Sequence, residues 1–205
     1  SARFLAPDES PIVLRSHDGQ PHASAARAQY PRPKMSGTEL PPRLAVVIAT
    51  CNRSRLLSER SLPSVVVQTR RPDTLVVVDD SQPEDRTANA ALVRSVMIPA
   101  CDVVYLANER TAGASGAWNT ALEFLTAETA DPSQVYVAIL DDDDAWHPEY
   151  LERCYSAVVH EQLDMVACGL RRIEAENNAP IFSEAPAVLR GTDFLTGNPG
   201  IQGSN

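Results

Sequence analysis

The sequence contains almost no lysine and no long apolar segment, and both absences limit what the chain can be. Lys34 is the single lysine among 18 basic residues, and 27 acidic residues bring the net charge to −9. Nucleic-acid binding depends on clustered basic side chains that neutralise phosphates, so no nucleic-acid partner is expected. No apolar run approaches the ~20 residues that cross a bilayer, so no transmembrane segment is expected either.

Cysteine is scarce as well. The four cysteines are not spaced like zinc ligands or like a redox pair; they are Cys51, Cys101, Cys154 and Cys168. We interpret them as reduced, mostly buried thiols of a cytoplasmic protein. The first ten residues lack the basic and apolar segments of a secretory signal, which agrees with that location. The hydrophobic fraction of 43% is sufficient for a packed core.

Proline divides the chain into two parts. Residues 1–43 hold seven of the 16 prolines and are expected to form an extended arm or linker. Residues 44–205 are expected to form one folded domain. The sequence leaves open whether the arm lies against the surface of that domain.

Short apolar runs alternate with helix-like segments after residue 43. The expected strands are 44–49, 74–78, 102–106, 135–140 and 164–168. The expected helices are 54–68, with a kink or break at Pro63, 84–96, 114–126, and 148–162, with Pro148 at its first position. Apolar runs without polar alternation are typical of strands buried on both faces. The alternation therefore predicts an α/β fold with a mostly parallel sheet flanked by helices.

Each of the first four expected strands ends in polar or small residues. These segments are 50–53, 79–81, 108–116 and 141–144. The carboxyl ends of parallel strands share one edge of the sheet, and ligands bind in the crevice outside that edge. The sequence therefore predicts a binding site there.

The four consecutive aspartates from Asp141 to Asp144 are the most distinctive of these segments. Two carboxylates 4 Å apart repel by about 4 kcal/mol at an effective dielectric constant of 20, which favours a bound cation. If the segment is extended, Asp141 and Asp143 point to one side, and Asp142 and Asp144 to the other. Carboxylates together with substrate phosphates suit Mg²⁺ or Mn²⁺, which would neutralise a diphosphate leaving group. A solvated acidic turn is the alternative.

The ends of the first two strands also have two interpretations. Asp79 and Asp80 could form a turn or cap the next helix, or accept hydrogen bonds from a nucleobase or a ribose. Thr50, Asn52 and Arg53 could cap the following helix. Arg53 could instead contact a phosphate or a base through its planar guanidinium group.

The glycines and tryptophans near these strand ends also have two interpretations each. The turn from Gly113 to Gly116 could present backbone N–H groups to an anion, or allow tight packing of a helix on a strand. Trp118 and Trp146 could stack on a base or a sugar, or belong to the core.

Four segments together resemble the family 2 glycosyltransferases of the GT-A fold. They read VVIATCNR, VVVDDSQ, NERTAGASGAWNTAL and AILDDDDAWHPEYLE, and their order and spacing match the family motifs, ending in the acidic DxD-type motif, over residues 44–155. The resemblance implies a Rossmann-like sheet, a nucleotide-sugar-binding part at 44–155, and the start of an acceptor-binding part at 156–205. It implies an enzyme of the hexosyltransferase type that transfers a sugar from a nucleoside-diphosphate sugar to an unknown acceptor with the help of a divalent metal.

The resemblance also assigns roles to residues. Asp143 would be the main ligand of Mn²⁺ or Mg²⁺, with Asp141 or Asp142 assisting. Asp79 would support its loop, and the catalytic base is expected beyond Asn205. The residues implied to line the nucleotide-sugar site are Ala49, Thr50, Asn52, Arg53, Asp79, Asp80, Asn108, Gly113, Trp118, Asn119, Asp141 and Asp142.

Three positions depart from the family pattern. Ala49 replaces the usual proline, Cys51 the usual tyrosine, and Trp118 the usual arginine. The missing tyrosine and arginine leave the donor preference open. A non-catalytic nucleotide-sugar-binding module is therefore an alternative function. A sugar-phosphate nucleotidyltransferase is a weaker one, because its glycine-rich signature is absent. The sequence also leaves homo-oligomerisation open.

Overall fold

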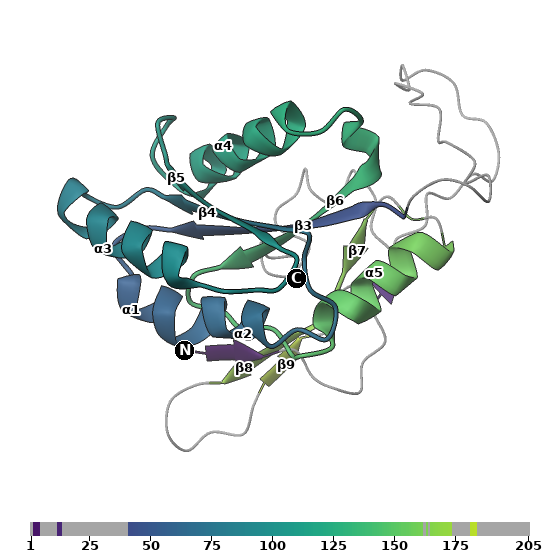
Figure 1. Ribbon diagram of the computed structural model, residues 1–205. Coiled ribbons are helices and arrows are strands. Elements are labelled where there is room, and N and C mark those ends of the chain that lie inside the picture. The colour runs from purple at the N-terminus through teal and green to yellow at the C-terminus, as the bar shows by residue number, and fades with distance from the viewer. Residues whose placement is uncertain are drawn as a thin grey trace, which may run out of the picture.

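A four-stranded parallel sheet forms the centre of the molecule (Figure 1). The computed structural model describes residues 2–4, 12–13, 41–161, 163, 165–173 and 181–183. The strand order is β5-β4-β3-β6, with β3 at Arg43–Thr50, β4 at Thr74–Asp79, β5 at Asp102–Ala107 and β6 at Val135–Asp141. The first four predicted strands and the α/β class with a parallel sheet are confirmed.

Helices cover both faces of this sheet (Figure 1). One face carries α1 (Ser54–Leu56), a π-helical segment (Leu57–Ser61), α2 (Leu62–Val66), α3 (Pro83–Ser95) and the first turn of α5 (Tyr150–Glu161). The other face carries α4 (Ala114–Ala127), and a short 3₁₀ turn at Pro132–Gln134 precedes β6. The two central strands are consequently shielded from water on both sides.

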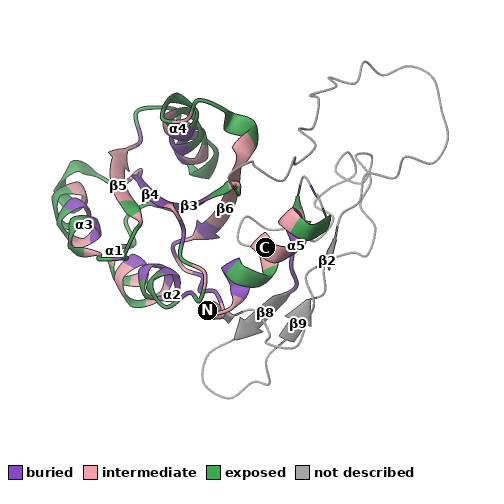
Figure 2. Ribbon diagram, turned by 45° about the vertical axis from the view of Figure 1, so that its right-hand side comes forward, coloured by how far each residue is buried: buried purple, intermediate pink, exposed green. Residues whose placement is uncertain are grey.

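The core divides into two layers because successive strand residues point to opposite faces. Val46 and Ile48 of β3 pack on the side of α2 and α3, whereas Val47 packs beneath α4. Ala117 and Ala121 of α4 are buried against the second layer, and their small size lets the helix approach the sheet closely. Figure 2 shows this burial on the inner sides of the helices, with exposed residues facing outward.

The fifth predicted strand is wrong in extent and in partner. The structure has a two-residue strand, β7 (Val166–Ala167), which pairs antiparallel with β2 (Ile12–Val13) and lies outside the parallel sheet. A separate antiparallel sheet has the order β1-β8-β9, formed by Ala2–Phe4, Leu170–Ile173 and Ile181–Ser183. Short segments from the proline-rich region thus pair with strands that follow α5.

Pro148 and Pro63 both lie near the start of a helix. The fourth predicted helix begins at Tyr150 and not at Pro148, because Tyr150 N–H donates to the His147 carbonyl at 2.9 Å in a turn that precedes the helix. Beside Pro63 the helical type changes, because the π-helical segment ends at Ser61 and α2 begins at Leu62. Pro63 lies in the first turn of α2, directly after the π-helical segment. Proline is tolerated in a first turn, because the N–H groups there have no carbonyl partner within the helix.

The structure brings together two cysteines whose sequence spacing gave no sign of it. The Sγ atoms of Cys154, on α5, and Cys168, after β7, lie 3.5 Å apart. Cys51 is exposed, and all four cysteines are free thiols. Within the part of the chain that the structure describes, no helix is long and apolar enough to cross a membrane.

Candidate functional site

The ends of the parallel strands meet at one edge of the sheet, as the sequence predicts. Thr50 at the end of β3 pairs with Asp79 of β4, and Ala49 pairs with Asp141 of β6. The backbone continues these pairings past the strands, because Asp80 N–H donates to the Thr50 carbonyl at 2.8 Å. The polar segments that follow β3, β4, β5 and β6 therefore lie side by side.

Asp142 is the buried centre of this edge. Its side chain is 5% exposed and accepts hydrogen bonds from Thr50 Oγ1 at 2.8 Å, from the Cys51 backbone N–H at 3.4 Å and from Arg53 at 3.1 Å. Burial raises the pKa of Asp142, and the contacts with Thr50 and Arg53 counteract part of that rise. The carboxylate thereby fastens the acidic segment to the end of β3.

Arg53 joins the two central aspartates. Its Nη1 atom lies 3.1 Å from Asp142 Oδ1 and 3.2 Å from Asp143 Oδ2. Both Arg53 and Asp143 are only half-buried, with 51% and 41% of their side chains exposed. The neighbouring Asp142 carboxylate raises the pKa of Arg53, so the guanidinium group remains charged. The acidic cluster is thus partly neutralised from within the chain.

The four aspartates form a turn rather than the extended segment that the alternation argument assumed. Asp144 N–H donates to the Asp141 carbonyl at 3.2 Å, and Arg60 Nη1 donates to the Asp143 carbonyl at 3.2 Å. Asp142 and Asp144 are nonetheless buried, whereas Asp141 and Asp143 are partly exposed. The alternate aspartates therefore still differ in burial, as the prediction for an extended segment had them on two sides, although the backbone forms a turn.

Asp143 and Asp141 are the predicted metal ligands, and both side chains are partly exposed. Among the described residues, no group of three or more His, Cys, Asp or Glu side chains is arranged to hold a metal. Mg²⁺ and similar ions, however, are commonly bound by one or two carboxylates together with substrate phosphates and water. Asp143 is 41% exposed and pairs through Oδ2 with Arg53, whereas the buried Asp142 accepts hydrogen bonds from Thr50, Cys51 and Arg53.

Asp79 supports the site from inside the protein. Its fully buried carboxylate accepts hydrogen bonds from the Ser81 N–H at 2.8 Å, Asn89 Nδ2 at 2.9 Å and the Tyr105 hydroxyl at 2.9 Å. Burial, reinforced by the Asp79 carboxylate, raises the pKa of Tyr105 well above its usual value. Asp79 thus connects the end of β4 with α3 and β5.

Asp80 holds the loop between β5 and α4. It accepts hydrogen bonds from Asn108 Nδ2 at 2.8 Å and from the Gly113 N–H at 2.6 Å. Gly113 has φ of +111°, a conformation that side-chain-bearing residues rarely adopt. A Cβ atom on Gly116 would lie 1.8 Å from the Thr111 carbonyl oxygen. Backbone geometry therefore accounts for both glycines.

The loops after β3 and β4 are joined through Asn52. Its backbone N–H donates to Ser81 Oγ at 2.7 Å, and its Oδ1 accepts from the Gln82 N–H at 3.0 Å. The exposed Cys51 lies beside them and donates from Sγ to the Asp80 carbonyl at 3.4 Å. Partial burial and the nearby carboxylates, Asp80 first among them, raise the pKa of Cys51.

The remaining predicted residues lie on α4 or in the core. Trp118 packs against the core layer beneath α4, and its buried Nε1 has no hydrogen-bond partner among the residues that the structure describes. Asn119 is exposed and lines a shallow groove along α4 with Arg110 and Leu122. Trp146 is buried and stacks on Tyr150 with ring centroids 4.5 Å apart, which confirms the core interpretation for this tryptophan.

Sequence reasoning missed several supporting residues. Ser81, Asn89 and Tyr105 fix the carboxylate of Asp79, and Arg60 fixes the acidic turn. Ser81 directly follows the paired aspartates, so its place in that motif was an available signal. Asn89, Tyr105 and Arg60 reach the site only through the packing of α3, β5 and the π-helical segment, and no local pattern marks them.

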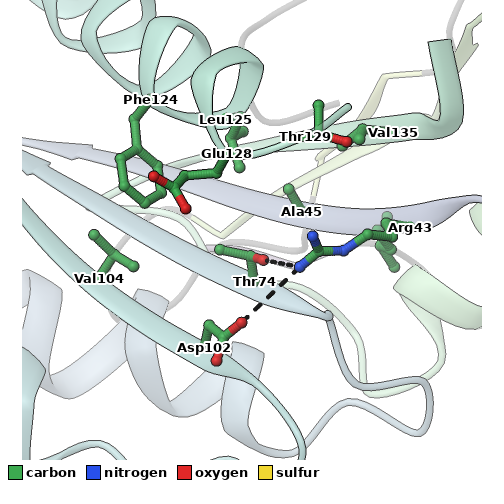
Figure 3. Close-up of a pocket in the computed structure, with 11 residues that line it drawn as sticks. Arg43, Ala45, Thr74, Asp102, Val104, Phe124, Leu125, Glu128, Thr129 and Val135 are labelled. Carbon is green, nitrogen blue, oxygen red and sulfur yellow. Dashed lines mark hydrogen bonds and ion pairs between the residues drawn. The ribbon is translucent and has the colours of Figure 1, made fainter. Parts of the chain in front are cut away.

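A cavity of about 90 Å³ lies at the opposite edge, where the strands begin (Figure 3). Arg43 and Phe124 line it, and Arg43 Nη2 donates to Thr74 Oγ1 at 3.0 Å. Pockets for small molecules and cofactors usually measure about 300–1,000 Å³, so this cavity is too small for a nucleotide. The polar strand ends at the other edge, and not this cavity, are therefore retained as the predicted binding site.

Comparison with known proteins assigns the family. Residues 45–199, more than half of the chain, match the family model described as Glycosyl transferase family 2. The chain therefore belongs to glycosyl transferase family 2, as the four motifs predict.

Two curated relatives agree with this assignment. The succinoglycan biosynthesis protein ExoW of Rhizobium meliloti (strain 1021) is 29% identical over 162 residues, covering 72% of this chain and 47% of the relative. An uncharacterized glycosyltransferase, alr2836, of Nostoc sp. (strain PCC 7120 / SAG 25.82 / UTEX 2576) is 30% identical over 111 residues, covering 54% and 31%. The chain spans less than half the length of either relative.

Two solved structures are similar to part of this chain. The mannosyltransferase PcManGT from Pyrobaculum calidifontis, in complex with GDP-Man and Mn²⁺, is 24% identical with a TM-score of 0.46, covering 58% of this chain and 33% of that one. S. aureus TarS (1–349) is 19% identical with a TM-score of 0.42 and the same coverage.

Proposed function

We propose that the strand-end site binds a nucleoside-diphosphate sugar and that the protein transfers the sugar to an acceptor. The observation that carries this proposal is the acidic turn that Asp142 fastens to the end of β3, beside the half-exposed Asp143 and Arg53. Family membership supports the reaction class, and the meeting of the polar strand ends at one edge supports the proposed location. The sugar, the nucleotide and the acceptor are left open by these residues.

The nucleoside would lie over the loops after β3 and β4. Asn52 joins these two loops through Ser81, and Thr50 fastens the end of β3 to the acidic turn after β6 through Asp142. Arg53 presents a half-exposed guanidinium group that suits phosphate oxygens. Cys51 occupies the place where the family usually has tyrosine, so base stacking there would be weaker than in a typical member.

Asp143 would hold a divalent ion, Mn²⁺ or Mg²⁺, with the diphosphate and water completing its coordination. The ion would supply charge stabilisation to the departing diphosphate. An acceptor hydroxyl, deprotonated by a carboxylate, would attack the anomeric carbon, and the bond from that carbon to the diphosphate oxygen would break. The chain's own contribution is to fix the acidic turn, through Asp142 and through Arg60 on the Asp143 carbonyl.

A non-catalytic nucleotide-sugar-binding module is a second candidate, and one observation favours it. Arg53 already neutralises part of the charge of Asp142 and Asp143, so a diphosphate could bind to Arg53 without an ion. Such a module would bind nucleotides equally well with and without Mn²⁺. It would also leave a nucleotide-sugar donor intact over long incubation with candidate acceptors.

Calorimetric titration of UDP, GDP and dTDP, with and without Mn²⁺, tests the proposal. We expect at least one nucleotide to bind more tightly with Mn²⁺, and we expect Asp143→Ala to remove that enhancement while the protein stays folded. Asp102→Ala is the matched control, since Asp102 is an 82% exposed carboxylate at the opposite edge. Metal-independent binding would favour the module, and no binding of any nucleotide would exclude the proposed site.

A further inference from the structure

Resting on the proposed function, we propose that Arg53 is an exchangeable internal cation that couples metal binding to nucleotide binding. In the nucleotide-free protein its guanidinium group pairs with Asp142 and Asp143. When a divalent ion binds at Asp143, Arg53 leaves that carboxylate and turns to the diphosphate. Arg53 is thus a positioning residue that makes the ion and the nucleotide bind together.

The geometry places one nitrogen between two carboxylates of unequal burial. Arg53 Nη1 lies 3.1 Å from Asp142 Oδ1, in the protein interior, and 3.2 Å from Asp143 Oδ2, at the surface. Asp142 keeps hydrogen bonds from Thr50 Oγ1 and from the Cys51 N–H if Arg53 moves away. Departure of Arg53 therefore does not leave the buried carboxylate without donors.

The contact with Asp143 is the one that can open. Both partners are about half exposed, and ion pairs between exposed side chains contribute little net stability. Arginine also has a long, flexible side chain, so the guanidinium group can move several ångströms while the backbone of the loop stays fixed by Asn52 and Ser81. A small change in the local charge is then sufficient to shift the position of Arg53.

A bound ion and a bound diphosphate act on the guanidinium group of Arg53 in opposite ways. A divalent ion at Asp143 would lie close to the guanidinium group, and the like charges repel. A diphosphate attracts the same group, because guanidinium forms paired hydrogen bonds with phosphate oxygens. Arg53 therefore weakens binding of the bare ion and strengthens binding of the ion with the nucleotide. By linkage, each ligand raises the affinity for the other by the same factor.

The test measures binding without turnover. The affinity for Mn²⁺ alone is measured from the electron paramagnetic resonance signal of free Mn²⁺ in wild-type protein and in Arg53→Met. We expect Arg53→Met to bind bare Mn²⁺ about tenfold more tightly, within the range usual for coupled sites. With saturating Mn²⁺, we expect its affinity for UDP or GDP to fall by about tenfold or more.

Two further variants keep the result interpretable. Arg53→Lys retains the charge and is expected to bind bare Mn²⁺ like the wild type. Arg55→Met is the matched control, because Arg55 lies in α1 two residues after Arg53, is 84% exposed and pairs with Glu59 instead of the acidic turn. Circular dichroism and a thermal melt of each variant establish that it is folded.

Each outcome decides the proposal. An unchanged or weaker affinity of Arg53→Met for bare Mn²⁺ would overturn it, since Arg53 would then not compete with the ion. A tighter affinity in Arg53→Met, with Arg53→Lys and Arg55→Met unchanged, would support it. If wild-type protein binds no nucleotide with Mn²⁺, the proposed function fails, whereas the comparison with bare Mn²⁺ still decides whether Arg53 competes.

Discussion

Replacement of Asp79 should destabilise the protein rather than merely impair ligand binding. Its carboxylate is fully buried and accepts hydrogen bonds from the Ser81 N–H, Asn89 Nδ2 and the Tyr105 hydroxyl. In Asp79→Ala the Tyr105 hydroxyl still reaches the Arg86 carbonyl at 3.2 Å. The Ser81 and Asn89 donors lose their main acceptor.

The expected cost follows from these two donors. A buried donor left without a partner costs about 1–3 kcal/mol, so Asp79→Ala should lower the free energy of unfolding by roughly 2–6 kcal/mol. Removal of a buried charge offsets part of that loss, which places the expected value in the lower half of the range. Tyr105→Phe removes one hydrogen bond to a charged acceptor and should cost about 1.5–3 kcal/mol.

Urea unfolding, followed by circular dichroism and by the fluorescence of the buried Trp146, measures these changes. The double variant of Asp79 and Tyr105 should lose less than the sum of the single variants, because both remove the same hydrogen bond. Asp102→Ala, at an 82% exposed carboxylate, should stay within about 0.5 kcal/mol of wild type. The reasoning is refuted if Asp79→Ala unfolds like the wild type but no longer binds nucleotide, since Asp79 would then contact the ligand.

Three other changes have defined outcomes. Gly116→Ala should lower stability by about 1–3 kcal/mol in urea unfolding, because its Cβ would overlap the Thr111 carbonyl oxygen at 1.8 Å; wild-type stability would show that the loop yields freely. Burial raises the pKa of the Cys101 thiol from 9.0 to about 11. Between these two pH values the unfolded chain loses the thiol proton while the folded protein keeps it, so the free energy of unfolding should fall as the pH rises through this range. Because that thiol is only half-buried, Cys101→Ser should reduce this alkaline loss by only about 1 kcal/mol, and an identical pH profile in both proteins would contradict the assignment. Iodoacetamide should alkylate the exposed Cys51 faster as pH rises toward its raised pKa, and a bound nucleotide with Mn²⁺ should slow the reaction; equal rates with and without ligand would place the nucleotide elsewhere.

The sequence predicts the sheet and its functional edge well because both depend on local patterns. Apolar runs without polar alternation identify β3 and β4, whose residues are buried on both faces, and each run ends where polar residues begin. The same pattern misassigned the segment around β7, since a short apolar run looks alike in a parallel sheet and in an antiparallel pair.

Contacts made by tertiary packing could not be predicted in this way. The position of Arg53 between Asp142 and Asp143 depends on the turn of the acidic segment, and the sequence left open whether that segment is extended or a turn. The approach of Cys154 and Cys168 depends on how α5 lies beside the strand that follows it. Neither carries a signal in the spacing of residues along the chain.

A structure of the protein crystallised with UDP or GDP and Mn²⁺ would test the central claim most directly. We expect the nucleotide to lie across the ends of β3, β4 and β6, with the ion between Asp143 and the diphosphate, and Arg53 moved from Asp143 to a phosphate oxygen. A nucleotide bound away from this edge, or an ion bound without any contact to Asp143, would contradict it.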